Sequence, residues 1–121
     1  MILQIDSTNR QEITLGLIGV TASSETIKTE KQSENLLPAL NKFLSKNNIQ
    51  LADLKAVLVN IGSGSYTGVR IGVTVANTLG WSLDLPVFGY NLTNLNENIA
   101  LANKAPQKFN QPVLPTYLDK K

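Results

Sequence analysis

The first part of the chain alternates between apolar and polar residues at the spacing of β-strands. The apolar run 2–5 predicts one strand, and the alternation over 13–17 predicts a second, half-buried strand. The more polar stretch 21–28 can return beside the second strand, with the turn around Gly19. The pattern therefore predicts three antiparallel strands.

Beyond this region, apolar residues recur three or four positions apart from Leu36 to Leu44, which predicts a helix. Ser33 is placed to cap this helix, with Glu34 in its first turn. Pro38 falls within the first two turns, where a proline can bend a helix without ending it. Further strands are predicted at 56–61 and 86–89, and further helices at 68–83 and 92–102. This order predicts an α/β fold: a mixed sheet in which parallel strands follow the antiparallel ones, with helices packed on the sheet.

Length and composition are those of one small globular domain. The chain has 121 residues, and 42% of them are apolar against 17% charged, so a core can form. The domain is expected to span residues 1–102. Residues 103–112 are polar and hold two prolines, which predicts a linker, and residues 113–121 form an apolar tail too short to fold alone.

Charge and missing residue types narrow the function. The net charge is +2 without a run of like charges, so nucleic-acid binding by this chain alone has little support. The chain has no cysteine and no histidine, which excludes thiolate and imidazole metal sites and triads with a histidine base. No stretch approaches the ~20 apolar residues of a membrane span, and the N-terminus does not resemble a secretory leader. We therefore expect a cytoplasmic protein without membrane contact.

The stretch 60–72 holds four glycines between a predicted buried strand and a predicted helix. A phosphate-binding P-loop needs a lysine after its second glycine, and no lysine occurs between residues 55 and 104. The first three glycines are spaced one position too widely for the dinucleotide-binding fingerprint. Tyr66 stands where a nucleophile elbow would have its serine. These three templates therefore do not fit.

Two interpretations of this loop remain. Free backbone N–H groups at the start of the following helix can bind an anion. On this interpretation the loop binds phosphate, at most weakly. The candidate residues for it are Asp6, Gly62, Ser63, Gly64, Ser65 and Thr67. The structural alternative is that Ser65 or Thr67 caps the helix and the glycines permit a tight turn.

The predicted helix 68–83 is apolar or small around most of its circumference. Gly72, Ala76 and Gly80 recur every four residues and form a stripe of small residues, which lets another helix approach closely. Such a helix needs cover on more than the one side that a sheet supplies. That cover is either the first helix of this chain or another subunit.

Several short motifs occur in a fixed order along the chain. They are Ile-Asp-Ser-Thr at 5–8, Gln-Ser-Glu-Asn-Leu-Leu-Pro at 32–38, Asp-Leu-Lys-Ala at 53–56, Gly-Ser-Gly-Ser-Tyr-Thr-Gly-Val-Arg-Ile-Gly at 62–72 and Pro-Val-Phe-Gly at 86–89. In order and approximate spacing they resemble the motifs of the TsaB family, formerly called YeaZ, and the eleven-residue loop is specific. The chain departs from that pattern at Gln32, where the family has histidine, at Ser63, where it has proline, and at 7–8, where Ser-Thr reverses the usual order.

The resemblance implies a lobe like those of the actin-like and Hsp70-like ATPases, of the ribonuclease H-like type. The family has two related lobes, whereas here a motif similar to its tail, Pro-Thr-Tyr-Leu at 115–118, follows the first lobe after a short linker. We therefore expect a short form that lacks most of the second lobe, with the tail packed back on the first.

The resemblance also implies a non-catalytic subunit that pairs with TsaD, which transfers the threonylcarbamoyl group to the adenosine beside the tRNA anticodon. It implies a heterodimer formed through first-lobe helices, contact with the ATPase TsaE, tRNA reached only through the complex, and neither cofactor nor metal. The expected interface residues are Ser33, Glu34, Leu36, Leu37, Leu40, Val69, Gly72, Val73, Ala76, Leu79 and Gly80. Two alternatives stay open: a small nucleotide-binding enzyme that uses Asp6 and the loop, and an autonomous homodimer built on the same helix face.

Overall fold

The computed structural model describes residues 1–19, 22–62, 66–91 and 93–114, without the side chain of Tyr66. Its strands are β1 (Ile2–Asp6), β2 (Glu12–Ile18), β3 (Ser23–Lys28), β4 (Ala56–Asn60) and β5 (Val87–Tyr90). Its helices are α1 (Gln32–Lys46), a one-turn 3-10 helix (Leu51–Asp53), α2 (Tyr66–Leu83) and α3 (Leu95–Lys104). Each predicted strand and helix is present, with ends displaced by a few residues.

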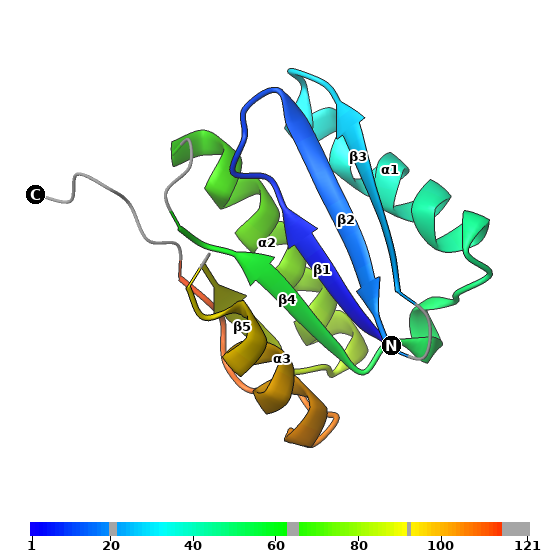
Figure 1. Ribbon diagram of the computed structural model, residues 1–121, viewed down its shortest axis with the longest axis vertical. Coiled ribbons are helices and arrows are strands. Elements are labelled where there is room, and N and C mark those ends of the chain that lie inside the picture. The colour runs from blue at the N-terminus through cyan, green and yellow to red at the C-terminus, as the bar shows by residue number, and fades with distance from the viewer. Residues whose placement is uncertain (20–21, 63–65, 92, 115–121) are drawn as a thin grey trace, which may run out of the picture.

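The strands form one mixed sheet in the order β3-β2-β1-β4-β5. β1, β2 and β3 are antiparallel neighbours, whereas β4 is parallel to both β1 and β5. The predicted antiparallel group and the parallel strands after it are both confirmed. The helices lie on two sides of this sheet: α1 and α2 are behind it in Figure 1, and α3 lies in front, beside β5.

Alternation along the strands divides the core between the two faces. On the α1 and α2 side, Leu3, Ile5, Val57 and Val59 of the sheet belong to the same buried cluster as residues of both helices. On the α3 side, a smaller cluster holds Ile2, Ala56, Leu58, Tyr90 and Ala102. β4 is buried along its whole length because helices cover both of its faces, as expected for a central parallel strand.

The start of α1 differs from the prediction. The helix begins at Gln32, its N-cap is Lys31, and no side chain caps it, so the prediction that Ser33 is the cap is wrong. The physical reason is the buried Gln32, whose side chain bonds to another segment, so that Gln32 and Ser33 both belong to the first turn. Pro38 lies inside the helix without ending it, as predicted.

The segment after α3 is attached to the domain. Asn110 exchanges side-chain hydrogen bonds with the backbone N–H and carbonyl of Val87, and Val113 exchanges backbone hydrogen bonds with the side chain of Asn77. The N–H of Phe109 donates to a carboxylate oxygen of Asp84 at 2.9 Å. Phe109, Asn110 and Val113 are therefore held against α2, β5 and the turn between them, and the first two residues of the stretch 103–112 belong to α3. Residues 115–121 of the expected tail lie outside the described residues.

Candidate functional site

Polar side chains meet where the parallel strands β1 and β4 end. Asp6 closes β1 and Asn60 closes β4, and the Asn60 amide donates to a carboxylate oxygen of Asp6 at 3.2 Å. The amide oxygen of Asn60 accepts the backbone N–H of Gly62 at 3.0 Å. Thr8 donates to the other oxygen of Asp6 from both its N–H and its hydroxyl. The structure thus brings Asp6 and Gly62 together at the carboxyl ends of the parallel strands, which is where α/β folds bind ligands.

The other predicted anion-binding residues divide into two groups. Thr67 lies in the first turn of α2 with its side chain exposed. Ser63, Gly64 and Ser65 lie outside the described residues. Asn60, which joins Asp6 to the loop, was not predicted, although a polar residue that ends a buried apolar strand was a signal for it.

Tyr90 lies next to this edge on the α3 side of the sheet. Its hydroxyl accepts a hydrogen bond from the side-chain amide of Gln4 at 2.9 Å. The pKa of Tyr90 is raised to about 12, mainly by burial; the bond from Gln4 lowers the pKa, and the nearby charge of Asp6 raises it. The phenol is therefore a neutral, structural group at ordinary pH.

This pKa predicts how the stability of the protein changes in alkali. The folded value lies above the ordinary 10.0, so the contribution of Tyr90 is fully present below pH 10 and is lost as the pH rises toward about 12. We expect Tyr90→Phe to flatten this alkaline loss, measured by urea unfolding at several pH values. Equal alkaline slopes in the variant and the unmodified protein would contradict the prediction.

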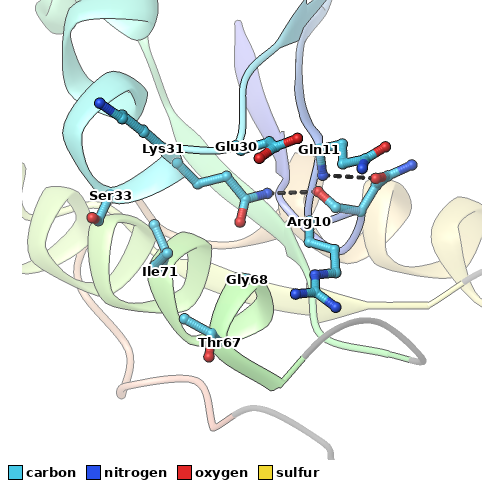
Figure 2. A pocket seen from close by; sticks show the side chains of 10 residues that line it. Arg10, Gln11, Glu30, Lys31, Ser33, Thr67, Gly68 and Ile71 are labelled. Carbon is cyan, nitrogen blue, oxygen red and sulfur yellow. Dashed lines mark hydrogen bonds between the residues drawn. The ribbon is translucent and has the colours of Figure 1, made fainter.

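A cavity of about 850 Å³ lies between the β1–β2 loop, the turn before α1 and the first turns of α2. Figure 2 shows it with Arg10, Lys31 and Ser33 at its margin and Thr67 and Ile71 on the helix below. Glu30 also lines it, so charges of both signs are present. Among the residues that the structure describes, no group of three or more histidine, cysteine or acidic side chains could hold a metal.

Gln32 builds one wall of this cavity and was missed as a functional position. Its side-chain amide nitrogen lies 3.1, 2.6 and 3.0 Å from the carbonyl oxygens of Ser7, Asn9 and Glu12, which places it at the centre of the β1–β2 connection. The side chain is buried, at 5% exposure. Gln32 therefore fixes the start of α1 against the end of β1.

The stripe of small residues on α2 faces the sheet. Ala76 is fully buried, and a Cβ added to Gly72 would meet the Ser7 side chain and, at 3.6 Å, Ile5. A Cβ added to Gly80 would meet the Val87 side chain. The prediction that this stripe contacts a partner is therefore wrong, because the strand side of the same chain covers it. α1 packs beside α2 on the same side of the sheet, as the alternative of cover by the first helix of this chain expected.

The remaining predicted interface residues are distributed between the core and the surface. Four are buried in the core, namely Leu36, Leu40, Val69 and Val73. Leu79 is half-buried, whereas Ser33 and Glu34 are exposed. Leu37 is 55% exposed. Of the predicted interface residues, Ser33, Glu34 and Leu37 are therefore exposed on the outward side of α1.

The helices of the described residues do not reach the length and apolar character needed to cross a membrane.

Two curated proteins are similar to the chain over most of its length. The tRNA threonylcarbamoyladenosine biosynthesis protein TsaB of Bacillus subtilis is 42% identical over 91 residues, which cover 71% of this chain and 38% of that protein. The protein of the same name from Buchnera aphidicola is 36% identical over 86 residues, with the same shares of each chain. The chain thus spans about two-fifths of the length of these relatives.

Solved structures have the same fold. YeaZ from Pseudomonas aeruginosa aligns with a TM-score of 0.70 and 25% identity over 74% of this chain and 44% of its own. RuvC from Thermus thermophilus aligns with a TM-score of 0.53 and 16% identity over 87% of this chain and 72% of its own, a likeness of fold alone. The ribonuclease H-like, actin-like lobe is therefore confirmed.

A family model described as TsaD: tRNA N6-adenosine threonylcarbamoyltransferase matches residues 20–119. This match shows that the chain is related to the TsaD enzymes. The two relatives with 42% and 36% sequence identity are both named TsaB. Within this group of related proteins, the chain belongs to the TsaB (YeaZ) family.

Proposed function

We propose that the chain is a non-catalytic binding subunit that docks on a TsaD-like threonylcarbamoyltransferase and supports threonylcarbamoyladenosine formation in tRNA. Its relatives are named for the biosynthesis of this nucleoside, and its family model carries the name of the transferase. The observation that carries the proposal is the outward side of α1, where Leu37 is 55% exposed. Leu37 lies in the second turn of α1, and in this proposal it is the apolar side chain that the partner covers.

The docking surface continues onto α2. Thr74 and Thr78 of α2 are exposed, and Ile71 and Val75 of the same helix are half-buried. A surface of threonines and partly covered aliphatic side chains packs closely against another helix because it carries few long charged groups. α1 and α2 lie on the same side of the sheet, so one helical partner can contact both (Figure 1).

Residues of the chain support a role without catalysis. The sequence has no histidine or cysteine, so a nucleophile with a histidine base has no candidate here. Asp6, the acid beside the glycine-rich loop, already accepts hydrogen bonds from Thr8 and Asn60. With a net charge of +2, the chain is proposed to reach tRNA through its partner, in the cytoplasm. A TsaE-like ATPase would then join the complex that the two chains form.

Leu37→Glu tests the docking surface. Burying an unpaired carboxylate in a helical interface is costly, so we expect binding to the TsaD-like protein of the same organism to weaken by about 100-fold or more. The measurement is isothermal titration calorimetry with both full chains, and the unmodified protein is expected to bind with 1:1 stoichiometry.

Leu101→Glu is the matched control. Leu101 is 54% exposed on α3, on the opposite side of the sheet, so the same substitution is made at equal exposure. It should leave the affinity for the TsaD-like protein unchanged. Equal weakening by both variants, or no complex with the unmodified protein, would refute the proposed surface. A dimer of this chain alone that Leu37→Glu dissociates would favour the homodimer instead.

A further inference from the structure

The outer edge of β3 is open to another strand. β3 is the last strand in the order of the sheet and pairs with β2 alone among the described strands. The N–H of Thr29 donates to the carbonyl of Gln11 at 3.0 Å, directly beyond the Glu12–Lys28 pair of the register. Hydrogen-bonded pairs alternate in antiparallel sheets, so the backbone groups of Ser24, Thr26 and Lys28 point away from β2.

A groove runs beside this edge, between β3 and α1. It encloses about 450 Å³ and includes the apolar residues Ile27, Pro38 and Ala39. Ile27 is half-buried and packs against the main core, so its outer surface forms part of the groove. A strand added to β3 would direct every second side chain into this hollow, because side chains alternate between the two faces of a sheet.

The charges along the groove favour an acidic occupant. Glu25 lies in the groove and is bound by Lys46 of α1 at 3.4 Å, so its charge is countered within the chain. Lys28 and Lys42 line the same groove and are exposed. Neither has an ion-pair partner among the described residues. The groove therefore presents Lys42 and Lys28 without an ion-pair partner among the described residues, next to backbone groups of β3 that point away from β2, although Glu12 stands opposite Lys28 in the register.

We propose that β3 and α1 bind an extended acidic peptide, which adds a sixth strand to the sheet along Ser24, Thr26 and Lys28. Backbone hydrogen bonds supply affinity in this mode of recognition, and pockets for alternate side chains supply selectivity. Aliphatic side chains of the peptide fill the hollow over Ile27, and a carboxylate meets Lys42. The surface differs from the outward side of α1 that carries Leu37, so this proposal does not depend on the TsaD-like partner.

Protection against aggregation explains only part of this arrangement. A short edge strand that carries a lysine resists pairing with other chains, and β3 has six residues and Lys28. That protective role gives no reason for a hollow with apolar walls next to the edge. A binding groove accounts for both the edge and the hollow.

The test uses the full chain and a fluorescein-labelled hexapeptide, Thr-Val-Thr-Val-Thr-Glu, whose valines and glutamate share one side of an extended strand. We expect saturable binding by fluorescence anisotropy, with a Kd of about 10–100 µM. Thr26→Pro removes an outward N–H and is tolerated at an edge because that group makes no bond to β2. Thr26→Pro and Lys42→Glu should each weaken binding by about tenfold or more.

Three controls separate the contributions. Thr26→Ala keeps the backbone N–H and should bind as the unmodified chain does. Lys104→Glu reverses a charge on α3, away from the groove, and should also bind normally. A peptide ending in lysine instead of glutamate should bind at least about tenfold more weakly. Circular dichroism of each variant verifies the fold.

The proposal is overturned if the glutamate peptide does not bind at millimolar concentration, or if Thr26→Pro, folded, binds it as well as Thr26→Ala does. Self-association of the chain that Thr26→Pro abolishes would also overturn it, because a second copy would then occupy the edge. Ultracentrifugation of the unmodified chain and of Thr26→Pro distinguishes that case.

Discussion

Gly80→Ala is expected to destabilise the isolated chain by about 1–3 kcal/mol. A Cβ at this position would collide with the Val87 side chain and lie 3.0 Å from the carbonyl oxygen of Leu85 and 3.1 Å from a ring carbon of Phe109. The Leu85 oxygen belongs to the backbone, so α2 would have to move away from β5. Alanine is a better helix former than glycine by about 1 kcal/mol, and the collision has to exceed that gain. Gly80→Leu should be more damaging still.

Urea unfolding of the isolated chain measures this effect. Ser82→Ala is the matched control because Ser82 is exposed on the same helix, so alanine there changes helix propensity without a collision. Its free energy of unfolding should equal or slightly exceed that of the unmodified protein. A Gly80→Ala chain of unchanged or higher stability that binds its partner more weakly would show that the small-residue stripe faces outward after all.

The strands and helices could be predicted from local patterns because each pattern has a local cause. The alternation at 13–17 predicted β2, one face of which packs against the main core while the other carries polar and small residues. The largely apolar run at 56–61, interrupted only by Asn60, predicted β4, which is buried on both faces. Only the ends of the elements differ from the prediction. At the start of α1, the side chain of Gln32 donates a hydrogen bond to the carbonyl of Asn9 in the β1–β2 loop, and the helix begins at Gln32.

The cover of the small-residue stripe could not be predicted in this way. Helical spacing shows that Gly72, Ala76 and Gly80 share one face, but it does not show which element covers that face. The answer depends on Ser7, which lies far from α2 in the sequence, and on Val87, which begins the strand just after α2. A close approach of helix and sheet needs small residues just as two helices do, so the stripe was compatible with both neighbours.

The candidate site was predicted in part for a similar reason. Asp6 follows one predicted strand and Gly62 follows another, and parallel neighbours bring their carboxyl ends to one edge of the sheet. The link through Asn60 and the position of Gln32 depend on side-chain hydrogen bonds between segments. Such bonds leave no periodic trace in a sequence.

Gln32→Leu is expected to cost about 2–4 kcal/mol of stability. Leucine has a similar size but cannot donate to the carbonyl oxygens of Ser7, Asn9 and Glu12, all within 3.1 Å of the Gln32 amide nitrogen. An amide nitrogen has two hydrogens, so these contacts share them, and the loss is smaller than that of three separate bonds. Ser33→Ala is the control: Ser33 is exposed at the next position and does not cap the helix, so the change in stability should stay within about 0.5 kcal/mol.

Gln32→Glu tests the same contacts through pH. An ionised carboxylate would face carbonyl oxygens that repel it, so the pKa of the introduced group is raised in the folded state above its ordinary value of about 4.3. Below that pH the group is protonated in both states and can still donate one hydrogen bond. As the pH rises, the unfolded chain loses the proton first, so the deficit relative to the unmodified protein should grow between about pH 4 and pH 7. A deficit that is constant over this range, measured by urea unfolding of both proteins, would mean that the Gln32 amide does not hold the β1–β2 connection.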